Sequence, residues 1–401
     1  MNRVNELIKE YCPDGVEIRC LEDCCNLLDK KRKPITKAAR EAGEYPYYGA
    51  NGIQDYVANY IFDGTFVLVG EDGSVITKSG TPVVTWAEGK IWVNNHAHII
   101  EEKEGVMLRY LYHYLQTIDV TSLIHGNIPK LTGGDFKALK IAVPPLEVQR
   151  EIVHILDSFT LLTAELTAEL TARKKQYNFY RDKLLTFESD IPLLPIKEVV
   201  KKSCAGATPA KGNPEYYEDG TIPWIRTQDV RFNEITEVDS FITEKAVEET
   251  AAKWIPENCV IVAISGATAG RCAINKIKAT TNQHCLNMKI DNEKALYKYV
   301  YYCICSKQDE LISKKQGARG DLNSSLILGT KIPVPKLEIQ KKIVHVLDNF
   351  ESICSDLNIG LPAEIEARQK QYEYYRDLLL TFAETGSTLM TDRQTDRAER
   401  N

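Results

Sequence analysis

The chain has 401 residues, of which 43% are hydrophobic and 26% are charged, and its formal net charge is −6. These values are ordinary for a globular protein of two or three domains, and they exclude a mostly disordered or collagen-like chain. No apolar run reaches the roughly 18 residues that a membrane helix needs, and residues 1–10 lack the apolar core of a secretory signal. We therefore expect a cytoplasmic protein that does not contact a membrane.

The cysteines and the charged residues indicate whether metal binding or nucleic-acid binding is expected. Eleven cysteines are scattered without the two ligand pairs that a zinc site requires, so no metal site is expected. The acidic net charge argues weakly against nucleic-acid binding. Local basic clusters decide attraction to phosphate, however, and such clusters occur at residues 30–33 and 314–315.

Residues 1–143 predict a globular domain of mixed strands and short helices, with β-rich runs such as Phe66–Val69 followed by glycine-rich turns. Residues 144–189 predict one long helix. Apolar residues recur there every three or four positions, and Pro144 stands where proline is tolerated at a helix start. From Pro145 to Phe187 this helix could reach about 64 Å at 1.5 Å per residue. An apolar stripe of that length requires a partner helix.

The second half of the chain repeats the first. The segment VPPLEVQREIVHILDSF at 143–159 recurs as VPKLEIQKKIVHVLDNF at 334–350, and RKKQYNFYRDKLLTF at 173–187 recurs as RQKQYEYYRDLLLTF at 368–382. A second globular domain is therefore predicted over 190–334 and a second helix over 335–386, with a break or kink at Gly360-Leu361-Pro362. We expect a polar, disordered tail over 387–401.

The two helices are predicted to pack antiparallel as a coiled coil, because each must lead from one globular domain back to the other. The fold class is therefore α+β, with two globular domains separated by two long helices and an internal pseudo-two-fold repeat. The globular domains themselves share only traces of similarity. Asn94 and His96 match Asn282 and His284 188 residues later, which favours a shared structural role for the two histidines.

This arrangement resembles the specificity (S) subunit of type I restriction-modification systems. The resemblance covers residues 11–386 and rests on VPPLEVQ, VPKLEIQ and the paired QYNFYRDKLL and QYEYYRDLLL segments. In the second domain, Gly206, Thr208, Pro209 and Trp224 resemble the start of the family's recognition domain. The tandem tetrads Thr163–Leu166 and Thr167–Leu170, both TAEL, are similar to the spacer repeat of the type IC subgroup. In the first domain the turn Tyr47-Tyr48-Gly49-Ala50-Asn51-Gly52 stands in the region of this start-of-domain signature, and the domain is interpreted as a different subclass.

The resemblance implies a non-catalytic subunit that recognises an asymmetric, bipartite site in double-stranded DNA, one half with each domain. The helices would dock two methyltransferase (M) subunits, and restriction (R) subunits would join them. The partners would bind S-adenosylmethionine, ATP and magnesium, and this chain would bind no cofactor. Two alternatives remain: an adenine methyltransferase, for which neither an Asp-Pro-Pro-Tyr-like tetrad nor a Gly-x-Gly turn suited to a methyl donor is present, and a coiled-coil scaffold without DNA binding.

Two sets of candidate site residues follow. Trp224 precedes Arg226 and Gln228, side chains suited to bidentate contacts with guanine and adenine, and basic clusters suit phosphate. The DNA-binding candidates are Lys30, Lys31, Arg32, Lys33, Tyr48, Asn51, Thr208, Lys211, Arg226, Gln228, Arg271, Lys314, Lys315 and Arg319. The candidates for the subunit interface and the packing of the helices are Leu146, Glu147, Gln149, Leu166, Leu170, Arg181, Leu337, Glu338, Gln340 and Arg376.

Overall fold

A computed structural model describes residues 2–73, 75–188, 191–315, 321–355 and 359–385 of the chain. It divides into two compact units. Unit 1 contains Met1–Leu166 together with the segment that begins at Glu364, and unit 2 contains Thr167–Ala363. The predicted tail at 387–401 lies outside the described residues.

Unit 1 is built on a six-stranded sheet with the strand order β2-β7-β5-β6-β3-β4. Its centre is an antiparallel pair in which Phe62 faces Ile91 and Val69 faces Val84. Short pairs flank the sheet, β1 with β10 and β8 with β9. The strands are β1 (Glu17–Cys20), β2 (Asn26–Leu27), β3 (Ala42–Gly49), β4 (Gly52–Val57), β5 (Phe62–Gly70), β6 (Val84–Val93), β7 (Ala97–Glu101), β8 (Ile124–His125), β9 (Lys130–Leu131) and β10 (Lys140–Val143).

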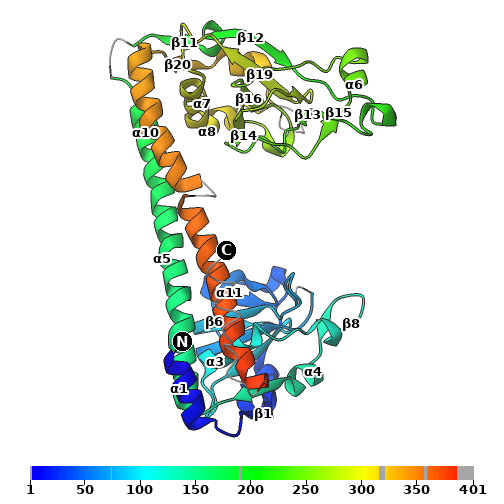
Figure 1. Cartoon of the computed structure of the whole chain (residues 1–401), viewed down its shortest axis with the longest axis vertical. Helices are drawn as coiled ribbons and strands as arrows, with labels where there is room; N and C mark the ends of the chain where they lie inside the picture. Colours follow the sequence, from blue (N-terminus) through cyan, green and yellow to red (C-terminus); the bar gives the residue numbers. More distant parts are fainter. Residues whose placement is uncertain (1, 74, 189–190, 316–320, 356–358, 386–401) are drawn as a thin grey trace. The chain divides into compact units, whose positions relative to one another are not determined.

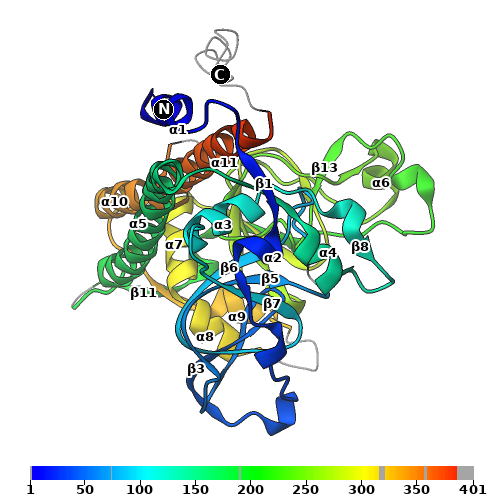
Figure 2. The ribbon, with the colours of Figure 1, turned by 90° about the horizontal axis from the view of Figure 1, so that it is seen from below.

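Short helices cover the unit 1 sheet. Helix α3 packs against β5 and β6, and its buried side chains join those of α2 and α4 in one core (Figure 2). Leu7 and Ile8 of α1 and Leu379 and Leu380 of α11 belong to the same core. The helices are α1 (Asn2–Tyr11), α2 (Leu21–Cys24), η1 (Asp29–Lys31), η2 (Lys37–Ala39), α3 (Leu108–Leu115), η3 (Thr121–Leu123) and α4 (Gly133–Ala138).

Unit 2 contains a five-stranded sheet with the order β12-β19-β16-β17-β14 and a three-stranded sheet with the order β15-β13-β18. The central strand β16 is buried at every position, which fits its continuous apolar sequence VIVA. The strands are β11 (Leu193–Pro195), β12 (Val200–Ala205), β13 (Ile222–Ile225), β14 (Glu234–Ile235), β15 (Phe241–Ile242), β16 (Val260–Ala263), β17 (Cys272–Asn275), β18 (Thr280–Thr281), β19 (Cys285–Ile290) and β20 (Lys331–Pro333).

Helix α7 of unit 2 corresponds to α3 of unit 1. It packs on β16, β17 and β19 on one side and on α10 on the other. The helices of this domain are η4 (Ile196–Glu198), η5 (Pro214–Tyr216), α6 (Glu244–Glu249), η6 (Gly266–Thr268), α7 (Tyr297–Ser306), α8 (Gln308–Ser313) and α9 (Ser324–Gly329). The mixed strand and helix content agrees with the predicted α+β class.

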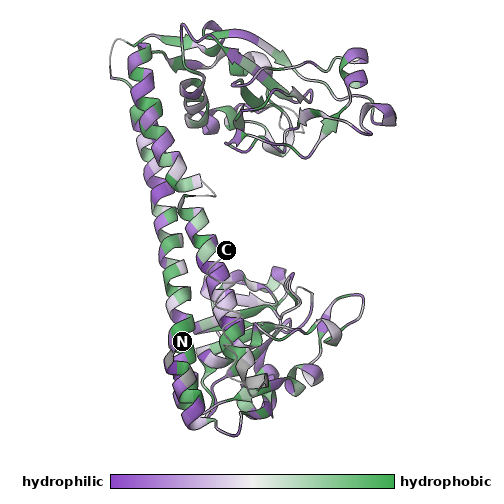
Figure 3. Cartoon of the chain, viewed as in Figure 1, coloured by the Kyte–Doolittle hydropathy of each residue, from purple (hydrophilic) through white to green (hydrophobic). Residues whose placement is uncertain are grey.

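The first predicted long helix is α5, which runs without a break from Leu146 to Leu184. The second is divided into α10 (Leu337–Ser355) and α11 (Leu361–Thr385), so the predicted break near Gly360 is present. Hydrophobic and hydrophilic residues alternate along these helices (Figure 3), as expected for helices that bury one face.

Each unit contains an antiparallel helix pair. In unit 1, α11 runs opposite to the first half of α5, and the rings of Phe159 and Tyr375 stack at 5.2 Å (Figure 1). In unit 2, Tyr180 near the end of α5 stacks on Phe350 of α10 at 5.7 Å. Lys174, earlier in α5, lies beside Cys354, later in α10, which sets the antiparallel direction.

A buried glutamine fixes each globular domain to the start of its helix. The Oε1 atom of Gln149 accepts from the Met107 backbone N–H at 2.9 Å, and its Nε2 donates to the carbonyls of Gly105 at 3.1 Å and Pro144 at 2.7 Å. Gln340 makes the matching contacts in unit 2, at 2.9, 3.3 and 2.8 Å, with Leu296, Lys294 and Pro335. Both side chains are fully buried, so removing either would leave buried backbone groups without partners.

One ion pair connects α3 to α5 in unit 1, and a second ion pair connects α7 to α10 in unit 2. Arg109 Nε lies 2.7 Å from Asp157 Oδ1 in unit 1, and Lys298 Nζ lies 3.0 Å from Asp348 Oδ2 in unit 2. A tyrosine hydroxyl on each short helix donates to the strand before the long helix, Tyr110 to Ala142 and Tyr299 to Pro333. The two domains therefore differ in sequence but share one set of anchoring contacts.

His113 completes the unit 1 anchor and should make its stability depend on pH. Its Nε2 lies 2.8 Å from Asp157 Oδ1 and its Nδ1 lies 2.9 Å from the Tyr372 hydroxyl. Burial lowers the pKa of His113 and outweighs the opposing effect of Asp157, while Arg109 and Arg376 lower it further. The unfolded chain therefore binds a proton more readily, so stability should fall as the pH drops below about 6.5.

We expect the free energy of unfolding of unit 1 to decrease between pH 7.5 and 5.5, by at most about 1.4 kcal/mol per pH unit from this group. The variant His113→Gln keeps a hydrogen-bonding side chain without a proton to gain, so its profile should be flatter. Denaturant unfolding at both pH values measures the difference. An equal pH dependence in wild type and variant would contradict the assignment.

Among the described residues, no helix is long and apolar enough to cross a membrane. All eleven cysteines are free thiols, and most are buried in the domain cores. Burial raises the pKa of Cys24 to about 11 and that of Cys25 to about 12, so these thiols are held in the neutral form.

Candidate nucleic-acid interface

The two globular domains present the same hydrogen-bonded frame at one end, although their sequences differ there. A parallel strand pair forms its base, with Tyr48 beside Val93 in unit 1 and Ile225 beside Thr281 in unit 2. The next residue, Asn94 or Asn282, donates its backbone N–H to the carbonyl of Tyr48 or Ile225, at 3.1 and 3.0 Å. This frame brings the segments that follow these strands together.

A second row of contacts extends the frame. The carbonyl of His96 accepts from the Glu71 N–H at 2.8 Å, and the Glu71 carbonyl accepts from the Leu131 N–H at 2.8 Å. In unit 2, His284, Ile264 and Leu322 form the same chain of bonds, at 2.9 and 2.8 Å. The segments after β3 (49–52) and after β13 (226–229) therefore occupy corresponding places, and we define this end of each domain as its loop end.

Two DNA-binding candidates of unit 2, Arg226 and Gln228, lie on the segment that follows β13 at its loop end. Gln228 is exposed, and the Arg226 backbone N–H donates to Asp229 at 2.8 Å. The Arg226 side chain is half-buried, and its Nε atom is buried without a hydrogen-bond partner. Trp224 is a core residue whose Nε1 donates to the Ala207 carbonyl at 3.1 Å.

Thr208 is connected to this loop end, and the other unit 2 candidates lie on other segments of the domain. The Thr208 hydroxyl donates to Gln283 Oε1, which joins the segment after β12 to the turn after β18. Lys211 is exposed and Arg271 is half-buried. Lys315 is half-buried, and Lys314 is paired with Glu310 of the same helix at 2.5 Å. Arg319 lies outside the described residues.

The unit 1 candidates separate into exposed and internal groups. Asn51 is exposed on the turn after β3, and Lys30, Lys31 and Lys33 are exposed beside η1. Tyr48 is only 7% exposed and belongs to the core cluster that also contains Phe62 and Ile91. Its position in the frame therefore depends on its backbone, and its ring packs in the core.

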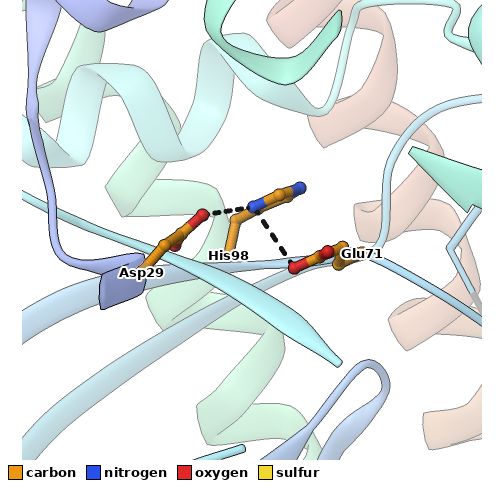
Figure 4. A group of neighbouring side chains, drawn as sticks. All are labelled: Asp29, Glu71 and His98. Atoms are coloured by element: carbon orange, nitrogen blue, oxygen red, sulfur yellow. Dashed lines mark hydrogen bonds and ion pairs between the residues drawn. The ribbon is translucent and has the colours of Figure 1, made fainter. Parts of the chain in front are cut away.

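Arg32 has an internal role in the structure. Its Nη1 lies 2.6 Å from Glu71 Oε2 and donates to the Ala97 carbonyl at 2.6 Å. His98 Nδ1 lies 2.7 Å from Asp29 Oδ2, and Glu71 lies on its other side (Figure 4). These three acidic and histidine side chains are close enough to hold a metal ion, but Arg32 and Lys130 pair with the same carboxylates, at 2.6 and 3.3 Å from Glu71. The group fits a buried ion-pair network better than a metal site.

The helix candidates also separate by burial. Gln149 and Gln340 serve the anchors inside each unit and are not available to a partner. Arg181 and Arg376 lie mostly buried over the rings of Tyr177 and Tyr372, at 5.8 and 5.6 Å. Glu147 and Glu338 are exposed, whereas the four candidate leucines Leu146, Leu166, Leu170 and Leu337 are half-buried.

Sequence reasoning did not identify several exposed residues that recur in both helices. His154 and His345 are exposed at matching places, and so are Phe179 and Tyr374, which are 61% and 45% exposed. The signal was present in the repeat itself, because the helical periodicity places these positions away from the buried stripe. The anchoring residues Arg109 and Lys298 were missed because they lie in the parts of the domains that do not match.

The protein-family model described as "Type I restriction modification DNA specificity domain" matches residues 13–173 and 189–367 of this chain. A Haemophilus influenzae protein, provisionally named a type I restriction enzyme specificity subunit, is 35% identical over 385 residues, which cover 92% of this chain and 96% of that protein. The Escherichia coli EcoR124I/EcoR124II specificity subunit is 38% identical over 290 residues, covering 69% of this chain and 71% of the relative.

Solved structures share the fold. The type I S subunit of M. genitalium superposes with a TM-score of 0.57 at 14% identity, covering 92% of this chain and 97% of that one. A structure described for the assembly and conformational transition of the type I restriction-modification system gives a TM-score of 0.55 at 16% identity, with 92% and 98% covered. The duplicated match and the extent of the sequence similarity show that this chain belongs to the family of type I restriction-modification DNA specificity subunits.

Proposed function

We propose that this chain recognises an asymmetric, bipartite site in double-stranded DNA, with one half bound by the loop end of each domain. The observation that carries the proposal is a common frame that presents different loops. The same backbone bonds support Gly49-Ala50-Asn51-Gly52 in unit 1 and Arg226-Thr227-Gln228-Asp229 in unit 2. Two domains that share one backbone frame but carry different side chains on it are suited to reading different bases.

The candidates that retain free or exposed groups carry this DNA contact. Arg226 and Gln228 suit base edges, while the exposed lysines 30, 31, 33 and 211 suit phosphates. Lys314, Lys315 and Arg271 remain phosphate candidates in unit 2, and Arg319, which lies outside the described residues, remains one from the sequence. The proposed domains are residues 1–143 and 190–334, and the proposed helical segments are 144–189 and 335–386.

The helices are the proposed docking surface for two methyltransferase subunits, which restriction subunits join. Exposed residues that recur at matching places in both helices support two copies of one partner; these are Glu147 and Glu338, His154 and His345, and Phe179 and Tyr374. The partner subunits would bind S-adenosylmethionine, ATP and magnesium. The complex would act in the cytoplasm, where its DNA substrate is.

The test is methyl transfer with and without the methyltransferase subunit encoded with this chain. The chain alone, with labelled S-adenosylmethionine and DNA, should give only background incorporation. The assembled complex should methylate one bipartite sequence. Methyl transfer by the chain alone would favour the methyltransferase alternative, and an assembled, active partner whose sequence preference is independent of this chain would favour a scaffold.

A further inference from the structure

One turn of similar sequence occurs in both loop ends, Asn94-Asn95-His96 in unit 1 and Asn282-Gln283-His284 in unit 2. In both, the first asparagine is buried, and its Oδ1 accepts from the backbone N–H of the histidine, at 2.8 Å in unit 1 and 3.1 Å in unit 2. The histidine therefore contributes its backbone, and the asparagine shapes the turn. The middle residue, Asn95 or Gln283, is exposed in both domains.

Each turn is braced by its own domain, so its middle residue is held in place. In unit 1, Arg32 Nη1 donates to the carbonyl of Ala97 at 2.6 Å and to that of Asn95 at 3.4 Å. The buried ion-pair network around Arg32 thus supports the turn from the interior. In unit 2, the side chain of Gln283 is itself oriented, because the Thr208 hydroxyl donates to its Oε1.

The orientation of Gln283 determines what it offers to a ligand. With Oε1 facing Thr208, the amide nitrogen lies 3.2 Å from His284 Nε2. An amide nitrogen carries two hydrogens, so one remains to donate outward. Phosphate oxygens accept hydrogen bonds and do not donate them, so an outward N–H beside a DNA-reading loop suits the DNA backbone.

Two acidic side chains near the turns accept hydrogen bonds from their own domains. Asp72 contacts His96 Nδ1 in unit 1. Asp321 in unit 2 accepts from the Ser265 hydroxyl at 2.6 Å and from the Gly266 N–H at 3.3 Å. The exposed middle residue of each turn is an amide, a neutral side chain that can donate hydrogen bonds.

We propose that Asn95 and Gln283 are matching contacts to the DNA sugar-phosphate backbone, one for each half-site. This inference rests on the proposed function. Two domains that read different bases share only the backbone of their half-sites, so a feature common to both loop ends fits the common part of the DNA. These residues position each domain on the duplex, and neighbouring loops such as 226–229 read the bases.

The test measures binding of the assembled complex to its target and to unrelated DNA of the same length. Gln283→Ala should weaken binding to both DNAs by a similar factor, about tenfold, because a hydrogen bond to a charged group is lost in both. Asn95→Ala should behave in the same way. Mapping of methylated sites should give an unchanged target sequence for both variants.

The variant Gln283→Lys distinguishes a contact with the DNA backbone from a contact with a base. A lysine beside a phosphate should tighten binding to both DNAs at low salt and steepen the salt dependence by about one counterion. Asn292→Ala, which removes an exposed amide on the turn after β19, is the matched control and should bind as wild type. Thermal unfolding and assembly with the methyltransferase subunit identify any variant that fails to fold.

Two results would overturn the inference. A changed base at one position of a half-site in Gln283→Ala or Gln283→Lys would make the residue a base reader. Unchanged affinity in all three variants, with wild type binding its target, would remove it from the interface. If the wild-type complex itself did not prefer one sequence, the proposed function would fail instead.

Discussion

Replacing residues 1–143 with the corresponding domain of another family member should change one half of the recognised sequence and leave the other half unchanged. The anchors make this exchange possible. Gln149 bonds only to backbone atoms of the domain, so a foreign domain can satisfy it with different side chains. The pair with Asp157 accepts either cation, because Lys298 takes the role of Arg109 in unit 2.

Mapping of methylated sites in a host that expresses the chimaera with its methyltransferase measures this outcome. The reciprocal exchange of residues 190–334 is the matched control and should change only the other half. The expected effect is complete loss of methylation at the original site, since every base contact of one half is replaced. Simultaneous change of both halves in one chimaera would contradict modular recognition.

Duplication of Thr167–Leu170 should lengthen the non-specific gap of the target by one base pair, with both half-sites unchanged. The tetrad lies inside the uninterrupted helix α5, and the boundary between the two units falls between Leu166 and Thr167. Four helical residues add about 6 Å and turn the following chain by about 40° beyond a full turn. One base pair advances DNA by about 3.4 Å and turns it by roughly 35°.

The added rotation of the helix matches the twist of one base pair. The added rise exceeds that of one base pair, but its projection on the DNA axis is smaller when the helix is inclined to that axis. Deletion of the tetrad should correspondingly shorten the gap by one pair. The control keeps the length of α5 and replaces Thr167–Leu170 by four other helix-forming residues, which should leave the gap unchanged. If the tetrad is only helix-forming filler, duplication would lower stability or assembly, and an active complex with the original gap would contradict the spacer role.

The repeated helices could be predicted from sequence because their signal is local and periodic. The apolar stripe from Val148 to Leu184 and the proline at each helix start were sufficient to predict α5, and its observed bounds differ by only a few residues. The break before Leu361 also followed from a local Gly-Leu-Pro signal. Such elements depend on the order of neighbouring residues and need no long-range pairing.

The loop ends could not be predicted because their frame is made of backbone bonds between distant segments. Tyr48 and Val93 share no side-chain pattern with Ile225 and Thr281, so the two strand pairs could not be aligned from their own residues. Arg32 was a candidate for phosphate contact because of its charge, but its side chain has an internal role. Its neighbours in the basic cluster are exposed, whereas its own side chain pairs with Glu71, 39 residues later. Local sequence contains no information about such a distant partner.

Gln149 and Gln340 illustrate a related limit. A polar residue in the first turn of a helix usually lies at the surface, and both were therefore interface candidates. The structure buries them because each satisfies backbone groups of the adjoining domain. Their burial in the folded chain, which the local sequence does not reveal, distinguishes these anchors from exposed contacts.

The most direct measurement of the central claim is methylome sequencing of a host that expresses this chain with its methyltransferase and restriction subunits. Two domains with one frame and different loops predict a single asymmetric target, made of two different half-sites separated by a gap of fixed length. A palindromic or continuous target would contradict the account, as would methylation whose sequence is unaffected when this chain is replaced by another specificity subunit.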